Sequence, residues 1–232
     1  MLKTELMQPE IVETQEGIHT VYSPEVKEHF HSLYGSMQES IHVFIGNGFN
    51  HSVHHKKEIR ILEMGFGTGL NAILTFRENQ IYKRNIYYTA LDIQPLPLTF
   101  VSKLNYFEYF GKPLQPVFQE MHRADWFRWK SFGNFSLLKL ETDILEHRFD
   151  EHYDLIYYDA FSPAHQPGLW SFEIFHKIFL ACNPGAVLVT YCAKGDVKRA
   201  LLAAGFEVET LRGPVGKREM IRGIKKSEVI YD

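Results

Sequence analysis

A glycine-rich loop between an expected strand and an expected helix constrains this chain more than any other feature. Residues 58–62 are apolar and rich in β-branched side chains, which is typical of a buried strand. The loop at 63–71 reads EMGFGTGLN, and residues 70–77 contain no Pro or Gly, which predicts a helix. Glycines allow positive φ angles and a close ligand, and a helix start offers unpaired N–H groups. The loop therefore predicts a site for a nucleotide-like ligand.

The glycine spacing separates two classes of nucleotide-like ligand. A dinucleotide-binding loop has the pattern G-x-G-x-x-G. Here the third glycine, Gly69, falls one position early, and Leu70 stands in the expected place. The spacing therefore disfavours a nicotinamide dehydrogenase. G-x-G-x-G with an acid just before it, here Glu63, is the pattern of S-adenosylmethionine methyltransferases. An ordinary tight turn between strand and helix is the alternative interpretation.

Acidic residues stand at the ends of three other expected strands. Asp92 ends the strand at 86–92, where a carboxylate can accept hydrogen bonds from both ribose hydroxyls of an adenosyl ligand. Asp143 follows the next strand, and Asp159 follows the strand at 153–158. Because the carboxyl ends of parallel strands lie at one edge of a sheet, we expect all three carboxylates near the loop. A helix cap or a turn is the alternative role of Asp92.

The alternation of strands and helices predicts an α/β fold, the Rossmann-like class I S-adenosylmethionine-dependent methyltransferase fold. We expect a mostly parallel sheet with a C-terminal antiparallel strand pair at 206–211 and 219–224. Residues 1–50 are expected to form a small N-terminal accessory segment, and residues 51–232 the methyltransferase domain. The other expected elements are strands at 18–22, 41–45, 135–140 and 186–192, and helices at 26–34, 98–110, 117–130, 171–182 and 196–204.

Composition and charge narrow the function classes. The chain has 232 residues and a formal net charge of −3, which argues against a general nucleic-acid coat but allows a local basic surface. Cys182 and Cys192 lie in apolar surroundings, which fits reduced thiols in a cytoplasmic protein. No apolar run approaches a membrane span, so no membrane partner is expected. His51, His54 and His55 lack an accompanying ligand pattern, so we expect a solvated loop and no metal site.

Four stretches, taken in order, resemble one family. They are residues 63–71, DILE at 143–146, DLIYYDAFSPA at 154–164 running on to Trp170, and GKREM at 216–220. Together they resemble the tRNA 5-methylaminomethyl-2-thiouridine methyltransferases, which occur as half of a bifunctional wobble-uridine enzyme and as stand-alone proteins. The chain departs from that pattern at Asp92, where relatives often have Glu, at Ala160, where they often have Gly, and around Lys194 and Asp196.

This resemblance implies a reaction, a cofactor and a partner. A methyl group would pass from S-adenosyl-L-methionine to the primary amine of 5-aminomethyl-(2-thio)uridine at the wobble position, in the anticodon stem-loop of tRNA. The product would be the 5-methylaminomethyl base. Because the flavin-dependent oxidase half of the bifunctional enzyme is not part of this sequence, a separate flavin-dependent oxidase is a candidate partner that would supply the aminomethyl substrate.

The chemistry of methyl transfer assigns roles to the carboxylates. Positive charge leaves sulfur and appears on nitrogen, so a carboxylate beside the amine gains strength as the reaction proceeds. We therefore place Asp92 on the ribose, Asp143 on the adenine and Glu63 near the methionine amino group. Asp159 would hold the amine and accept or relay its proton, and Phe161 would shape a dry pocket for the base. The alternatives are that Asp159 holds its loop or the methionine end, and that Phe161 only packs the loop.

The expected site therefore has three parts. The expected catalytic residues are Asp159 and Phe161. The expected cofactor-binding residues are Glu63, Gly65, Phe66, Gly67, Thr68, Gly69, Asn71, Asp92, Asp143, Ile144 and Asp159. The expected RNA contacts are the basic residues Lys194, Arg199, Lys217 and Arg218. For these basic residues a solvated charged face is the alternative. The aromatic and basic side chains at 117–130, with Trp126 and Trp129, could also stack on RNA, but an amphipathic helix with both tryptophans in the core is favoured.

Two other functions remain open at this point. A polyamine aminopropyltransferase shares the fold and an acidic end of the fourth strand. Its glycine loop usually carries another acid, whereas Phe66 and Thr68 flank Gly67 here. A non-catalytic adenosyl-binding partner protein would bind S-adenosylmethionine without modifying tRNA.

Overall fold

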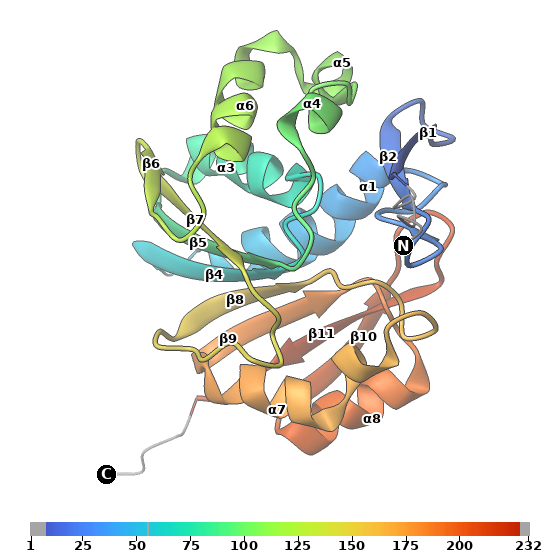
Figure 1. Ribbon diagram of the computed structural model, residues 1–232. Helices are drawn as coiled ribbons and strands as arrows, with labels where there is room; N and C mark the ends of the chain where they lie inside the picture. Colours follow the sequence, from blue (N-terminus) through green and yellow to red (C-terminus); the bar gives the residue numbers. More distant parts are fainter. Residues whose placement is uncertain (1–7, 55, 228–232) are drawn as a thin grey trace, which may run out of the picture.

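The computed structural model of the chain describes residues 8–54 and 56–227, and its main feature is an eight-stranded sheet. The strands are β4 Glu58–Met64, β5 Asn85–Asp92, β6 Lys130–Phe132, β7 Phe135–Glu141, β8 Tyr153–Tyr158, β9 Cys182–Thr190, β10 Glu207–Arg212 and β11 Glu219–Ile224. Their order across the sheet is β10-β11-β9-β8-β4-β5-β7-β6 (Figure 1). Strands β9, β8, β4, β5 and β7 are parallel, β11 is antiparallel to β9 and β10, and β6 is antiparallel to β7. The expected fold, with its C-terminal antiparallel pair, is confirmed.

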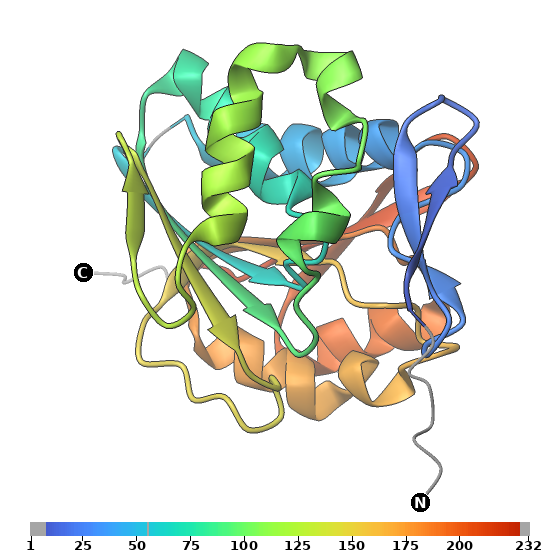
Figure 2. The same ribbon diagram turned by 45° about the horizontal axis from the view of Figure 1, so that its top comes forward.

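Helices cover both faces of this sheet (Figures 1 and 2). On one face lie α3 (Leu70–Tyr82), α6 (Gln115–Arg123) and the helical segment η1 (Ile41–Phe49). On the other face lie α7 (Phe172–Leu180) and α8 (Gly195–Ala204), close to the bounds expected from the sequence. Both faces are therefore shielded from water, as a largely parallel sheet requires.

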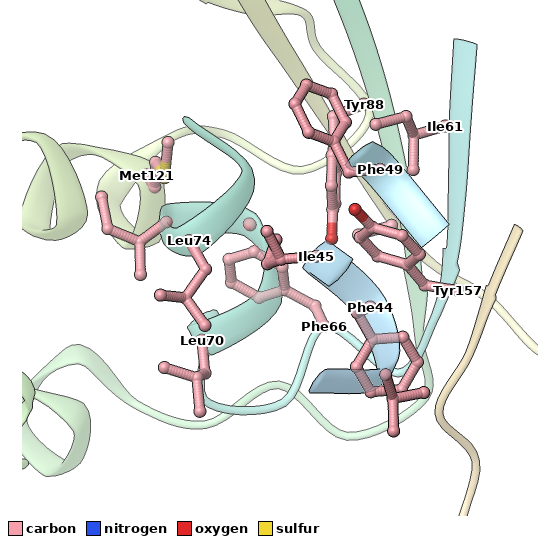
Figure 3. Close-up of a cluster of buried hydrophobic side chains, with 14 of the residues drawn as sticks. Phe44, Ile45, Phe49, Ile61, Phe66, Leu70, Leu74, Tyr88, Met121 and Tyr157 are labelled. Atoms are coloured by element: carbon pink, nitrogen blue, oxygen red, sulfur yellow. The ribbon is translucent and has the colours of Figure 1, made fainter. Parts of the chain in front are cut away.

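Each face of the sheet has its own apolar core. Successive residues of a strand point to opposite faces, so Ile61 of β4 joins the core beneath η1 and α3, whereas Leu62 joins the core against α7 and α8. Figure 3 shows part of the first core, where Phe44 of η1 meets Tyr157 of β8 with ring centroids 5.3 Å apart. Every residue of β8 is buried, which accounts for its nearly unbroken apolar sequence.

A small antiparallel sheet precedes the main fold. It consists of β1 (Glu10–Glu13), β2 (His19–Ser23) and β3 (Glu28–His29). The strand expected at 18–22 is confirmed as β2, whereas the helix expected at 26–34 is wrong, because this stretch contains β3. Lys27 has a φ of 60° and its N–H donates to Ser23 O at 2.7 Å, which closes a hairpin instead of a helix.

A continuous helical segment follows, made of α1 (Ser36–Ser40), η1 and α2 (Asn50–Ser52). The strand expected at 41–45 is therefore wrong. In η1 the hydrogen bonds reach five residues back, as in the bond from Asn50 N–H to Ile45 O, so this segment is a π-helix. A short apolar run fits a buried helix as well as a buried strand. The domain boundary expected after residue 50 falls inside this segment, and the division into two domains stays a prediction.

The helix expected at 98–110 is divided into two. The structure has α4 (Leu98–Val101) and α5 (Tyr106–Phe110), followed by the short 3-10 helix η2 (Lys112–Leu114). Between α4 and α5, the side chain of Asn105 is used for a tertiary contact, since its Oδ1 accepts from His19 N–H at 2.8 Å. No local pattern in the sequence announces that contact.

The helix expected at 117–130 is wrong beyond Arg123. Residues 130–132 form β6, which pairs with β7, and Trp126 pairs with Lys139 of the same strand. Trp129 is 43% exposed, so the expectation of both tryptophans in the core is not upheld. Among residues 8–54 and 56–227, no helix has the length and apolar character needed to span a bilayer.

Candidate functional site

A pocket of about 370 Å³ opens at the carboxyl ends of β4, β5, β7 and β8. Five parts of the chain line it: the glycine loop, the segment after β5, the segment after β7, the loop after β8, and the N-terminal segment around β3. Three strand-end acids predicted from the sequence, Asp92, Asp143 and Asp159, all reach it. This is the edge of an open α/β sheet where ligands bind, beside the point at which the strand order reverses.

The glycine loop has the backbone conformation that the sequence suggested. Gly67 and Gly69 have φ values of +50° and +72°, a region that favours glycine. A Cβ atom on Gly67 would lie 3.0 Å from the Phe30 ring, so a larger residue would crowd the pocket. Helix α3 begins at Leu70, and no described side chain caps its first turn. Its N-terminal N–H groups can therefore serve an anionic group of a ligand.

Asp92 and Asp143 lie side by side at the ends of β5 and β7. Asp92 Oδ2 accepts a hydrogen bond from Gly67 N–H at 2.8 Å, and Oδ1 accepts from Gln94 N–H at 2.8 Å. Burial raises the pKa of Asp92, and these backbone donors offset part of that rise. Asp143 Oδ1 accepts from Leu145 N–H at 2.9 Å. Each carboxylate is thus fixed by local backbone while it faces the pocket.

The most buried charges of the site lie behind the glycine loop. Glu63 at the end of β4 is 1% exposed, and burial together with the Asp159 carboxyl raises its pKa well above the usual range. Asn71 in the first turn of α3 donates from Nδ2 to Asp159 Oδ2 at 2.8 Å. Burial, and then Glu39, raise the pKa of Asp159 well above its usual range, while Asn71 and Lys217 lower it. Asn71 and Asp159 line the pocket, and Glu63 stands behind them.

Aromatic donors hold the loop that follows Asp159. Tyr191 Oη donates to Ala160 O at 2.9 Å, and Trp170 Nε1 donates to Phe161 O at 2.7 Å; Trp170 closes the 3-10 helix η3 (Pro167–Trp170). The Phe161 ring meets the Phe30 ring edge-on, with centroids 5.2 Å apart. Both phenyl rings line the pocket together with Asp159, so apolar surface accompanies the carboxylate and its Asn71 partner at this end.

Phe66 and Thr68 of the glycine loop are supported from the outer side by α6 and β7. The Phe66 ring lies 5.1 Å from the His122 ring, and His122 Nε2 is 3.1 Å from Thr68 O. Lys139 Nζ donates to His122 O at 2.8 Å and lies 5.4 Å from the centre of the Phe66 ring. Burial lowers the pKa of His122 to about 4 and that of Lys139 to about 8. At neutral pH His122 behind the loop is therefore neutral, whereas most of Lys139 keeps its charge.

The N-terminal segment supplies pocket residues that sequence reasoning missed. Phe30 and His31 line the pocket, as do Ser23, Glu25 and Val26. Glu28 Oε2 accepts from Ser162 N–H at 2.8 Å and lies 3.0 Å from His165 Nδ1, so it holds the loop after β8. The phenyl ring of Phe30 touches two predicted site residues, yet nothing in the local sequence marks it. The segment expected to be accessory is part of the wall of the pocket.

The four basic residues expected to contact RNA lie outside the pocket lining. Lys194 precedes α8, Arg199 forms an ion pair with Asp196, and Arg218 has a side chain that is 95% exposed. Lys217 instead forms an ion pair with the buried Glu39. All four stay predictions as RNA contacts. A phosphate contact needs a free ammonium group, whereas the ammonium group of Lys217 is bound to Glu39.

Known proteins share both the sequence and the fold. Residues 133–226 match the family described as S-adenosyl-L-methionine-dependent methyltransferase. The tRNA 5-methylaminomethyl-2-thiouridine biosynthesis bifunctional protein MnmC of Cupriavidus metallidurans is 30% identical over 215 residues, which are 87% of this chain and 32% of that protein. The chain is similar to the MnmC-related S-adenosylmethionine-dependent methyltransferases. The resemblance seen in the sequence motifs is confirmed, and S-adenosylmethionine is the cofactor of this family. The chain spans about a third of the length of that MnmC relative.

Solved structures agree on the fold of this MnmC-related chain. A crystal structure of MnmC2 from Aquifex aeolicus superposes with a TM-score of 0.78 at 23% identity, over 99% of this chain and 74% of that one. A class I S-adenosylmethionine-dependent methyltransferase from Listeria monocytogenes, described as putative, superposes with a TM-score of 0.53 at 14% identity, over 85% of this chain and 62% of that one. The class I methyltransferase fold is therefore established for the chain.

Proposed function

We propose that this methyltransferase methylates the exocyclic primary amine of 5-aminomethyl-(2-thio)uridine at the wobble position of tRNA. The product would be 5-methylaminomethyl-(2-thio)uridine. The observation that carries the proposal is Asp159, a buried carboxylate that lines the pocket together with the Phe30 and Phe161 rings, in a chain similar to MnmC. Such a site can attract a cationic amine and still exclude water from it.

The remainder of the pocket suits S-adenosylmethionine, which supplies a methyl group activated on a sulfonium centre. Asp92 would hold the ribose hydroxyls, and Asp143 with Ile144 would face the adenine. The glycine loop and the uncapped start of α3 would face the methionine carboxylate. Asn71 would face its amino group, and Glu63 would act on that group from behind Asn71. The positive φ at Gly67, with the Phe30 ring close by, supports a tight fit there.

Asp159 would act on the amine that becomes methylated. An alkyl amine has a pKa near that of Lys, about 10.4, so most of it is protonated at neutral pH and must lose a proton before it attacks. Asp159 would bind the ammonium form, orient it, and accept or relay that proton. A carboxyl group whose pKa is raised by burial is a better acceptor than an exposed aspartate. Phe30 and Phe161 would flank the base.

The test is an incubation with methyl-labelled S-adenosylmethionine. Purified protein would meet tRNA from cells that lack the final wobble methyl group, and the tRNA would then be digested to nucleosides. Label in 5-methylaminomethyl-(2-thio)uridine, lost in Asp159→Ala, would support the proposal. If S-adenosylmethionine binds but no tRNA is labelled, the proposal is wrong. The next reaction to examine would then be transfer from decarboxylated S-adenosylmethionine to putrescine.

A further inference from the structure

We infer that Lys217, paired with Glu39, is a positioning residue for the loop that carries Asp159, rather than a contact to tRNA phosphates. The inference rests on the proposed function, since it concerns the end of the pocket where the acceptor amine would bind. In this interpretation, two distant parts of the chain support the Asp159 end of the pocket. They are α1, which carries Glu39, and the turn between β10 and β11, which carries Lys217.

The first observation is the burial of the ion pair. The Lys217 ammonium binds Glu39 Oε1, and the exposed fractions of the two side chains are 31% and 6%. Glu39 Oε2 accepts from Ser32 N–H at 2.8 Å, so both carboxylate oxygens have partners. If Lys217 turned outward to a phosphate, the Glu39 carboxylate would stay buried without its counter-charge, which is strongly unfavourable. The ion pair with Glu39 therefore holds Lys217 in place.

The second observation links Lys217 to the loop after β8. Its Nζ lies 3.8 Å from the centre of the Tyr191 ring, well within cation–π range. Tyr191 Oη donates to Ala160 O, the carbonyl that follows Asp159. The Tyr191 ring also contacts the Trp170 ring, with centroids 6.1 Å apart, and Trp170 holds Phe161 O. Lys217 is thus linked to the Ala160 carbonyl, next to Asp159, through Tyr191, and to the Phe161 carbonyl through Tyr191 and Trp170.

The third observation is electrostatic. The titratable and charged side chains that act on the Asp159 carboxyl come from several elements, and they are Glu39, Glu63, Tyr88, Tyr191 and Lys217. Glu39 raises the pKa of Asp159, and Lys217 lowers it. Loss of the Lys217 charge alone would leave the effect of Glu39 uncompensated. The pKa of Asp159 would then rise further, and less of it would be ionised to bind the amine.

The turn between β10 and β11 is held against the N-terminal segment at two more points. His42 Nε2 lies 2.7 Å from Arg212 O. Gly216 has a φ of +82°, and a Cβ atom there would overlap the Tyr34 ring. The place of Lys217 is therefore fixed by packing on both sides of it. A lysine held in this way suits a positioning role.

The first test measures Asp159 directly and needs no methyl transfer. In the full chain, carbon-13 NMR of the Asp159 carboxyl gives its pKa in the native protein, in Lys217→Met and in the double variant Glu39→Gln/Lys217→Met. We expect the Asp159 pKa to be higher in Lys217→Met and to return toward the native value in the double variant. The double variant also avoids a buried, unpaired charge at position 39, so it should fold. Lys226→Met, which breaks an exposed ion pair with Glu207, is the matched control and should cause no shift.

The second test separates positioning from phosphate binding. For Lys217→Met we expect kcat at saturating tRNA to fall about 10-fold, with the KM for tRNA and its salt dependence unchanged. The acidic limb of the pH–rate profile should move to higher pH, and Lys217→Arg should recover most of the rate. A phosphate contact would instead raise the KM for tRNA and reduce the salt slope by about 1, with kcat preserved.

The outcomes are distinct for the two proposals. An unchanged Asp159 pKa in Lys217→Met, or a change confined to the KM for tRNA, overturns the inference. If the native chain methylates no tRNA while the Asp159 pKa still responds to Lys217, the proposed function fails and the coupling of Lys217 to Asp159 stands.

Discussion

At the scale of single residues, Glu63 is a buried acid behind the candidate site, and its burial lowers the stability of the folded chain. It is an acidic residue with 1% of its surface exposed, at the end of a central strand. Burial disfavours its charged form, and the neighbouring Asp159 adds repulsion. A group with these properties destabilises the folded chain once it must ionise. Its retention makes sense if a cationic group, such as the amino group of the cofactor, offsets that charge in the complex.

This reasoning gives a stability prediction for Glu63→Gln. The folded pKa is raised, so native stability is lost as pH rises from the unfolded value, about 4.3, toward the folded one. Glu63→Gln has no carboxyl group at this position, so it does not lose stability in this way as pH rises. Its free energy of unfolding at pH 7 should exceed that of the native chain by about 1 kcal/mol, and the difference should vanish below about pH 4. Urea unfolding at both pH values checks this, with the exposed Glu58→Gln as control. Equal stabilities at pH 7 would contradict it.

Asp92 carries a prediction about the cofactor. Its carboxylate fixes Gly67 N–H and faces the pocket. In Asp92→Ala both the loop contact and the proposed ribose contact are lost. Because a hydrogen bond to a charged group contributes about 1.5–3 kcal/mol, affinity for S-adenosylmethionine should fall about 10- to 100-fold. Calorimetric titration measures this, and Asp125→Ala, on the exposed segment before β6, serves as control. Unchanged affinity would remove Asp92 from the site.

At the scale of elements, the hairpin of β2 and β3 is the part of the site that joins distant segments. Glu28 of β3 accepts from Ser162 N–H, and Glu25 Oε2 accepts from Gln94 Nε2 at 3.0 Å. These bonds connect the hairpin to the segments after β8 and β5. The hairpin therefore covers the pocket from the side that the main sheet leaves open.

The contact of Glu28 can be tested by hydrogen exchange. In Glu28→Gln the charge-assisted bond to the backbone is weakened, so the amide of Ser162 should exchange about 10-fold faster under native conditions. Amides in β8 should keep their protection, because the core is untouched. Glu25→Gln, which alters only an exposed side-chain bond, should leave Ser162 unchanged. Undiminished protection of Ser162 in Glu28→Gln would show that other contacts hold this loop.

Local patterns account for what could be predicted from the sequence. The glycine loop and the strand-end acids Asp92, Asp143 and Asp159 follow from spacing within one βα unit and from the common edge of parallel strands. Phe30 and Glu28 could not be predicted, because they reach residues far along the chain through a hairpin with no repeating pattern. The π-helix η1 was missed because its apolar run matches a buried strand equally well.

At the scale of the whole molecule, the proposed binding of tRNA would have to overcome a net charge of −3. Exposed bases such as Arg218 would then carry the phosphate contacts, and activity should fall steeply as salt increases. Arg218→Gln should raise the KM for tRNA and reduce the salt slope by about 1, with kcat unchanged. Initial rates over a range of salt concentrations measure both quantities. A flat salt profile for the native chain would rule out an electrostatic RNA surface near the β10–β11 turn.

The account depends most on the amine as the methyl acceptor, and one comparison tests this directly. Two synthetic anticodon stem-loops would differ only at the wobble position, one with 5-aminomethyluridine and the other with uridine. Each would be incubated with the protein and methyl-labelled S-adenosylmethionine. The account predicts label only in the aminomethyl stem-loop, recovered as 5-methylaminomethyluridine and lost in Asp159→Ala. Equal labelling of both stem-loops, or label on a base other than the wobble uridine, would contradict it.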